Sequence, residues 1–172
     1  RKIGATLGYE EDGWKLVDDI LNVRVLDTTL KDAKENSMMV CVAYKAGAGK
    51  TAGSKIFFKH NKKKQVFYLH CRDWGVRQFL TEVCRVIGVD VSRRHMKADE
   101  ILMEVIRFFL VRAVHKPLLI IDQANDLKSG ALRSLIHLYN ATEDKLGIVM
   151  LGTDHLSKII KSGVRHNRQG FD

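Results

Sequence analysis

A run of small residues followed by a lysine and a threonine is the part of this sequence best suited to chemistry. The segment reads Lys45-Ala46-Gly47-Ala48-Gly49-Lys50-Thr51-Ala52 and directly follows an apolar run. Small residues let backbone N–H groups come close to a phosphate, and a helix N-terminus behind them adds a favourable dipole. Lys50 is spaced to reach the β- and γ-phosphates of a nucleotide, and the Thr51 hydroxyl to bind Mg²⁺. We predict an ATP-binding phosphate loop here, with a glycine-rich turn that binds nothing as the alternative.

One position departs from the full pattern G-x-x-x-x-G-K-[ST]. Tyr44 stands where the pattern has its first glycine. That glycine eases the turn out of the preceding strand, so a tyrosine changes the entry into the loop. Its ring is expected to pack near the nucleotide base or against a neighbouring segment.

A second chemical element lies about seventy residues after the loop, where the apolar run Leu118-Leu119-Ile120-Ile121 ends in Asp122. A carboxylate at the C-terminal end of a buried strand beside a phosphate loop is able to hold Mg²⁺ through water. An apolar strand that ends in an aspartate for structural reasons alone is the alternative. The pairing with a phosphate loop at this distance favours the magnesium site.

The next residue, Gln123, occupies the position where NTPases with such a phosphate loop and acidic strand end usually carry a glutamate. A glutamate there orients or deprotonates the attacking water, whereas an amide hydrogen-bonds the water but cannot accept its proton. We expect the site to bind ATP well and to hydrolyse it slowly. Two explanations stay open: a natural protein that works as an ATP-occupied switch, or a glutamate replaced in order to trap the ATP state.

Thr153 follows the fourth apolar run, in the segment Gly152-Thr153-Asp154. A polar residue at the end of that strand is placed to sense the γ-phosphate and to help position water. A role as the N-cap of the following helix is the competing interpretation, because threonine also favours that position.

Alternating apolar runs and amphipathic stretches must position these residues. Helices are expected over 14–25, 24–35, 52–60, 76–87, 99–114, 129–140 and 154–161, and strands over 38–43, 66–71, 118–121 and 147–151. Strands that alternate with helices predict a parallel sheet with helices on both faces, the α/β fold of a P-loop NTPase. We divide the chain into an N-terminal helical segment, 1–37, and a P-loop NTPase core, 38–172.

The composition is that of a globular protein with an excess of positive charge. Hydrophobic residues make up 45% and charged residues 28%, and no apolar run approaches the ~20 residues of a membrane span. The net charge of +9 suits contact with a phosphate polymer, although solubility alone also explains it. Cys41, Cys71 and Cys84 show neither a CxxC pair nor matching histidine spacing, so we expect buried, reduced thiols and a cytoplasmic location.

Three stretches of the chain resemble the AAA+ regulators of DNA transposition, the MuB and TnsC/TniB kind. They are 43–51 around the phosphate loop, 118–128 around Asp122 and Gln123, and 148–156 around Thr153. With the elements between them, the resemblance spans roughly residues 15–172. It implies the large α/β subdomain of an AAA+ protein, with the fifth strand, the helical lid and the arginine finger expected beyond Asp172. Arg165 and Arg168 are the arginines nearest to that expected place.

Such proteins bind ATP, form rings or helical filaments on double-stranded DNA, and recruit a transposase to the target site. The resemblance therefore implies ATP and Mg²⁺ as ligands, duplex DNA and a transposase as partners, and no membrane. It also implies a nucleoid-associated protein of a bacterium, a phage or a mobile element. Lys50, Thr51 and Asp122 match the nucleotide and magnesium residues of the family. Thr153 matches its first sensor, and Gln123 its catalytic glutamate.

The DNA-facing surface of that family includes the loop after the second strand and the helix that follows. Here this region carries Arg72, Trp74 and Arg77, and the next connection carries Arg93, Arg94 and Lys97. Such side chains suit contact with phosphates without reading of bases. Solvated basic residues on ordinary loops are the alternative, because single charge clusters are weak indicators.

Two other functions agree with the same phosphate site. A replication initiator or helicase loader of the AAA+ type shares every feature of it, whereas a signalling or secretion NTPase would bind nucleotide but no DNA. A salt-dependent shift of random duplex DNA, with and without ATP, separates the last from the other two. A transposase gene beside the coding gene would favour transposition over replication.

Overall fold

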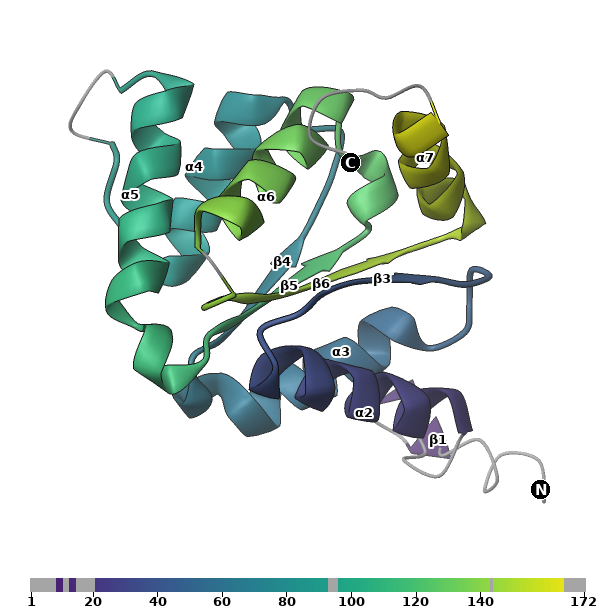
Figure 1. Cartoon of the computed structure of the whole chain (residues 1–172). Coiled ribbons are helices and arrows are strands. Elements are labelled where there is room, and N and C mark those ends of the chain that lie inside the picture. Colours follow the sequence, from purple (N-terminus) through teal and green to yellow (C-terminus); the bar gives the residue numbers. More distant parts are fainter. Residues whose placement is uncertain (1–8, 11–12, 15–20, 93–95, 143, 166–172) are drawn as a thin grey trace.

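Four parallel strands form the central sheet of the protein (Figure 1). The computed structural model describes residues 9–10, 13–14, 21–92, 96–142 and 144–165. The strands are β3 (Met39–Ala43), β4 (Val66–His70), β5 (Leu118–Asp122) and β6 (Gly147–Gly152), in the spatial order β3-β6-β5-β4. Because every neighbouring pair is parallel, the carboxyl ends of all four strands lie at the same end of the sheet.

Helices cover both faces of this sheet. On one face lie α2 (Leu21–Glu35) and α3 (Lys50–Asn61); on the other lie α4 (Val76–Ile87), α5 (Ala98–Val111), α6 (Ser129–Ala141) and α7 (Asp154–Arg165) (Figure 1). This arrangement confirms the predicted α/β fold of a P-loop NTPase. Within the described residues, none of the helices combines the length and apolar character that a membrane span requires.

Strand residues alternate between two hydrophobic cores. In β5, Leu119 and Ile121 belong to the larger core under α4, α5 and α6, whereas Leu118 and Ile120 belong to the smaller core under α2 and α3. Alternation along a strand therefore places Asp122 on the same face as Ile120, the face that α3 covers. Every residue of β5 and β6 is buried, as expected for central parallel strands with helices on both sides.

The N-terminal part of the chain differs from its prediction. Trp14, expected to begin a helix, lies in the two-residue strand β2 (Gly13–Trp14), which pairs antiparallel with β1 (Tyr9–Glu10). The helix was predicted from the spacing of apolar residues alone. That spacing takes no account of the preference of tyrosine and tryptophan for extended structure. Residues 15–20 of the expected helix lie outside the described residues. From Leu21 onward α2 is helical, and its buried stripe packs directly on the sheet.

The helix expected over 99–114 ends earlier, at Val111. A 3-10 turn, Ala113–His115, follows it, and Lys116 then adopts a left-handed φ of 47°. The proline at position 117 accounts for the conformation of Lys116, because the residue before a proline is disfavoured in the right-handed helical region. The chain then enters β5 at Leu118.

The three cysteines fall into two environments. Cys71 and Cys84 are buried, as predicted, but Cys41 is exposed, so the prediction is wrong there. Cys41 lies in β3, which among the described residues pairs on one side only, with β6. Burial raises the pKa of Cys71 to about 12 and that of Cys84 to about 11, so both thiols stay protonated at neutral pH.

Candidate nucleotide-binding site

The phosphate loop joins the carboxyl end of β3 to the first turn of α3. Gly47 and Gly49 both have a φ of 79°, in the left-handed region that glycine enters at little cost. Gly49 directly precedes α3, whose first residue is Lys50. The two glycines thus supply the turns that lead from the strand to the helix N-terminus, where phosphate groups are favoured.

Gly47→Ala is expected to lower the free energy of unfolding by about 1–2 kcal/mol, the cost of a left-handed conformation in a residue with a Cβ. A Cβ at Gly47 would meet no atom within 4 Å, so steric overlap does not contribute. Gly75→Ala is the matched control, because its Cβ also meets nothing within 4 Å while its φ is −78°. Chemical denaturation without nucleotide measures the difference, and equal stability of the two variants would contradict this loop conformation.

Two backbone carbonyls of the loop hold the Lys50 ammonium. Lys50 Nζ donates to the Tyr44 carbonyl at 2.6 Å and to the Lys45 carbonyl at 2.8 Å. The Tyr44 N–H donates to the Gly152 carbonyl at 3.2 Å, which fixes the entry of the loop to the end of β6. Tyr44 is 53% exposed, so its backbone, more than its ring, ties it to the loop.

A pocket of about 310 Å³ lies where the phosphate loop meets the ends of β5 and β6. It is lined by Ala46, Gly47, Ala48, Gly49, Lys50, Thr51, Ala52, Asp122, Gln123, Gly152 and Thr153. The residues predicted for catalysis, nucleotide binding and metal binding therefore converge on one hollow, with Lys45 adjoining through its carbonyl. Its place beyond the carboxyl ends of parallel strands is where open α/β sheets bind their ligands.

Asp122 is the buried carboxylate of this pocket, with 2% exposed. Its Oδ2 accepts a hydrogen bond from the Tyr68 hydroxyl at 2.6 Å and lies 3.2 Å from His70 Nδ1, while its Oδ1 accepts the Gln123 N–H at 3.0 Å. The register of β4 and β5 pairs His70 with Asp122. Burial, reinforced by the hydrogen bond to Asp122, raises the pKa of Tyr68, so its hydroxyl remains a donor at neutral pH.

The donor atoms fit a magnesium ion that is shared with a nucleotide. Thr51 and Asp122 bring a hydroxyl and a carboxylate to the same pocket. Mg²⁺ in proteins is commonly held by one or two carboxylates, with waters and substrate phosphates as its other ligands. In the part of the chain that the structure describes, no group of three or more His, Cys, Asp or Glu residues could form a closed metal site. A metal in this pocket would therefore depend on the phosphates for much of its coordination.

Gln123 turns the chain sharply at the end of β5. Its φ of 58° and ψ of 39° are left-handed, which is uncommon for a residue with a side chain. The hydrogen bond from its N–H to Asp122 supports this turn. Strained residues of this kind concentrate at functional sites, and Gln123 lines the pocket. Its part in hydrolysis stays a prediction.

Thr153 lines the pocket between β6 and α7. Its N–H donates to Asn125 Oδ1 at 3.2 Å, so a residue in the 3-10 turn after β5 (Ala124–Asp126) holds the backbone of the expected sensor. Gly152 leaves room for this contact, because a Cβ there would lie 2.9 Å from Asn125 Oδ1. Thr153 also directly precedes α7, so the helix-capping interpretation stays open beside the sensor.

Tyr68, His70 and Asn125 are absent from the site predicted from the sequence. A histidine at the carboxyl end of a strand was an available signal, but its partner follows from the pairing of β4 with β5. The contact of Asn125 with Thr153 joins two turns that are 28 residues apart. No sequence pattern indicates that contact.

Comparison with known proteins places this chain in a family. The family model described as an AAA domain matches residues 32–160, which is more than half of the chain. The chain belongs to this AAA domain family. Membership identifies the protein as a P-loop ATPase of the AAA+ class.

The crystal structure of Cdc6p from Pyrobaculum aerophilum is among the solved structures that resemble this AAA domain. The TM-score is 0.61 with 19% sequence identity, so the likeness shows the fold. It covers 81% of this chain and 39% of Cdc6p, and the chain thus spans well under half of that protein's length. No curated protein matches the sequence. The comparisons do not single out the transposition regulators within the AAA+ class.

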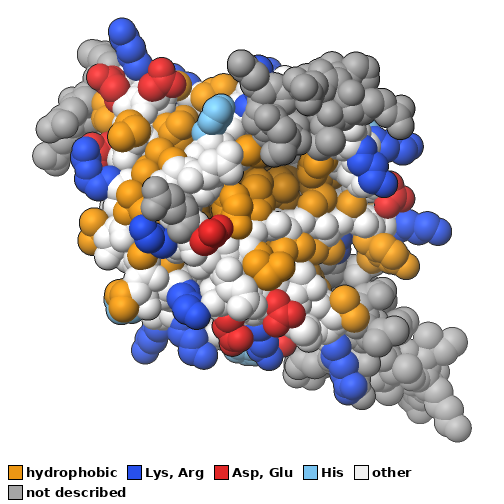
Figure 2. Space-filling model, in the orientation of Figure 1, with side chains coloured by type: hydrophobic (Ala, Val, Ile, Leu, Met, Phe, Trp, Pro, Cys, Tyr) orange, Lys and Arg blue, Asp and Glu red, His pale blue; other side chains and the backbone are white. Residues whose placement is uncertain are grey.

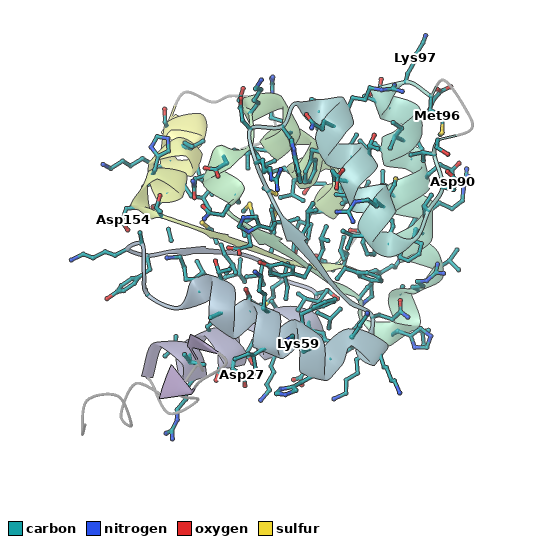
Figure 3. The ribbon with its side chains drawn as sticks, turned by 180° about the vertical axis from the view of Figure 1, so that it is seen from behind. Asp27, Lys59, Asp90, Met96, Lys97 and Asp154 are labelled. Atoms are coloured by element: carbon teal, nitrogen blue, oxygen red, sulfur yellow. The ribbon has the colours of Figure 1, made fainter. Side chains whose placement is uncertain are left out.

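The residues of the AAA domain that were predicted to contact DNA differ in their surroundings. Arg72 and Lys97 are exposed, and Lys97 lies at the start of α5 (Figure 3). Arg77 is exposed as well, but its guanidinium donates to the Met96 carbonyl and so ties α4 to the segment before α5. Arg72 and Lys97 are therefore the better candidates.

Other parts of that prediction do not hold or fall outside the structure. Trp74 is only 9% exposed and belongs to the larger hydrophobic core, so its expected place on a DNA-facing surface is wrong. The apolar neighbourhood of α4 and α6 attracts the indole more strongly than solvent does. Arg93 and Arg94 lie outside the described residues.

Proposed function

We propose that this AAA domain binds MgATP and works as an ATP-occupied switch with slow hydrolysis. The observation that carries the proposal is the convergence of Lys50, Thr51, Asp122 and Gln123 on one pocket. Asp122 is the single acidic residue among those that line it, and Tyr68 already donates to this carboxylate. The lining thus offers a buried carboxylate for magnesium but no second carboxylate to take a proton from water.

Each group has a distinct task in this mode of binding. The phosphates lie against residues 45–52 and the N-terminus of α3, where Lys50 offsets their negative charge. Thr51 and Asp122 hold Mg²⁺, which supplies further positive charge to the β- and γ-phosphates. The amide of Gln123 and the hydroxyl of Thr153 orient a water near the γ-phosphate without accepting its proton. ATP is consequently retained.

Calorimetric titration of the protein with ATP in the presence of Mg²⁺ tests this proposal. We expect saturable binding at one site, and ATP recovered from the complex should remain largely intact over many minutes. Absence of saturable binding would contradict the nucleotide site. Rapid release of phosphate would instead contradict the switch and show that another residue serves as the base.

We further propose that duplex DNA is the macromolecular partner, contacted through its phosphates. The net charge of +9, the exposed Arg72 and Lys97, and the three stretches similar to transposition regulators support this. On the face shown in Figure 2, Lys and Arg side chains lie around the periphery and the centre is hydrophobic. A test of DNA binding must therefore distinguish the effect of where the positive charges lie from the effect of the total net charge.

Replacing both Arg72 and Lys97 by alanine is expected to weaken binding to all duplex sequences alike. It should also reduce the slope of log affinity against log salt by about one unit for each DNA phosphate that the variant no longer neutralises. Binding should require ATP, because assembly multiplies the few DNA-binding groups of one subunit. Gel shifts of random duplex DNA over a range of salt, with and without ATP, measure these effects.

The control for this experiment removes the same charge elsewhere. Lys62 and Lys63 are exposed and precede the amino end of β4, whereas Arg72 follows its carboxyl end. The Lys62→Ala, Lys63→Ala protein should keep most of the slope. Equal slopes for the two double variants would mean that net charge alone acts, which contradicts the proposed surface.

The finer role we propose is the selection of target DNA for a transposase. The similarity of residues 43–51, 118–128 and 148–156 to transposition regulators supports it. Replication initiation is the second candidate, favoured by the fold similarity to Cdc6p. ATP-dependent retention of a transposase encoded by a neighbouring gene would support the first role. Assembly with ATP but without DNA binding at low salt would favour a signalling or secretion NTPase.

A further inference from the structure

One hydroxyl group holds the carboxylate that we propose to bind magnesium. Tyr68 donates a hydrogen bond to Asp122 Oδ2 at 2.6 Å. Tyr68 lies in β4 and Asp122 at the end of β5, and these two strands pair in parallel. The contact thus reaches from the neighbouring strand to the acidic residue that lines the pocket.

Packing fixes the Tyr68 ring independently of its hydroxyl. The ring lies against Phe58 of α3, with centroids 6.0 Å apart, and it packs on the smaller hydrophobic core. Alternation along β4 and β5 places Tyr68 on the same face as Asp122. The pairing of β4 with β5 therefore places the Tyr68 hydroxyl at the Asp122 carboxylate. A phenylalanine at position 68 would keep the ring and remove this donor.

The contacts of Asp122 leave little freedom to its carboxylate. A carboxylate offers about four acceptor sites on its two oxygens. Here Tyr68 and His70 lie at Oδ2, and the Gln123 N–H occupies a site on Oδ1. About one acceptor site remains for a water bound to Mg²⁺, so its direction depends on the groups that hold the other sites.

We propose that Tyr68 is a positioning residue for magnesium: its hydroxyl holds the Asp122 carboxylate in one orientation. The inference rests on the proposed MgATP site and adds to it a residue outside the pocket lining. Groups that hydrogen-bond to metal ligands typically change metal affinity about 10–100-fold when they are removed.

Titration with a fluorescent ATP analogue, once with Mg²⁺ and once with EDTA, tests the role of Tyr68. In Tyr68→Phe we expect the gain in nucleotide affinity from Mg²⁺ to fall by about tenfold or more. Affinity in EDTA should stay at the wild-type value, because Lys50 and the loop are untouched. A role in stability alone would lower the melting temperature without changing this Mg²⁺-dependent gain.

Tyr139→Phe is the matched control, since it removes a phenolic hydroxyl that donates to the Ser37 carbonyl at 3.1 Å, outside the pocket. It should keep the full gain from Mg²⁺. His70→Ala removes the other group that lies at Asp122 Oδ2. It should lower the gain in the same direction, which covers the case of a Tyr68→Phe protein that does not fold. Wild-type gains in both Tyr68→Phe and His70→Ala would overturn the inference, whereas a wild-type protein that binds no ATP in either buffer would overturn the proposed function itself.

Discussion

Lys50→Ala is expected to weaken ATP binding by about a hundredfold. Lys50 is the single lysine or arginine among the residues that line the pocket, so its removal leaves the β- and γ-phosphates without a side-chain cation there. A hydrogen bond to a charged group contributes about 1.5–3 kcal/mol, and each 1.4 kcal/mol is about a factor of ten in affinity. The oriented backbone of the loop remains and accounts for the residual binding.

Lys59→Ala is the control for this measurement. Lys59 is an exposed residue of the same helix, and it lies about two and a half turns beyond Lys50 (Figure 3). Its replacement removes the same charge but should leave the affinity for ATP close to the wild-type value. Calorimetry on the three proteins makes the comparison, with thermal melts to show that each is folded. Equal affinity in the Lys50 and Lys59 variants would refute the phosphate loop as the nucleotide site.

The phosphate loop could be located from the sequence because its geometry constrains neighbouring residues. The two turns with φ of 79° require small, flexible residues at Gly47 and Gly49, and Lys50 and Thr51 must follow directly at the helix N-terminus. The fold could also be predicted from the sequence. Buried parallel strands must be apolar on both faces, so runs such as 118–121 stand out among amphipathic helices.

Features that depend on the order of strands could not be predicted in this way. The contact of Tyr68 with Asp122 requires β4 beside β5, and the exposure of Cys41 requires β3 at the edge of the described sheet. Neither position carries a local pattern of its own. Burial of Trp74 likewise depends on where α4 and α6 pack. In the sequence, the nearby arginines suggested an exposed surface for this residue instead.

The prediction of slow ATP hydrolysis depends on Gln123. It lines the pocket with Lys50 and Thr153, directly after Asp122, and its left-handed backbone is held by a hydrogen bond to that aspartate. Glutamate has the same length and the same number of rotatable bonds as glutamine. Gln123→Glu therefore allows the side chain to accept a proton from water, with little change in the position of the side chain.

Gln123→Glu is expected to raise the rate of ATP hydrolysis by about 10²–10⁴-fold, the contribution of a positioned general base. Phosphate release in a single turnover, with ATP bound before the reaction is followed, measures the chemical step apart from binding. Gln78→Glu introduces the same change on the exposed face of α4 and should leave the rate unaltered. Both variants are compared at the same protein concentration, so any contribution from a neighbouring subunit is common to them. An unchanged rate in a Gln123→Glu protein that binds ATP normally would mean that position 123 does not reach the attacking water, and the slow hydrolysis would then need another cause.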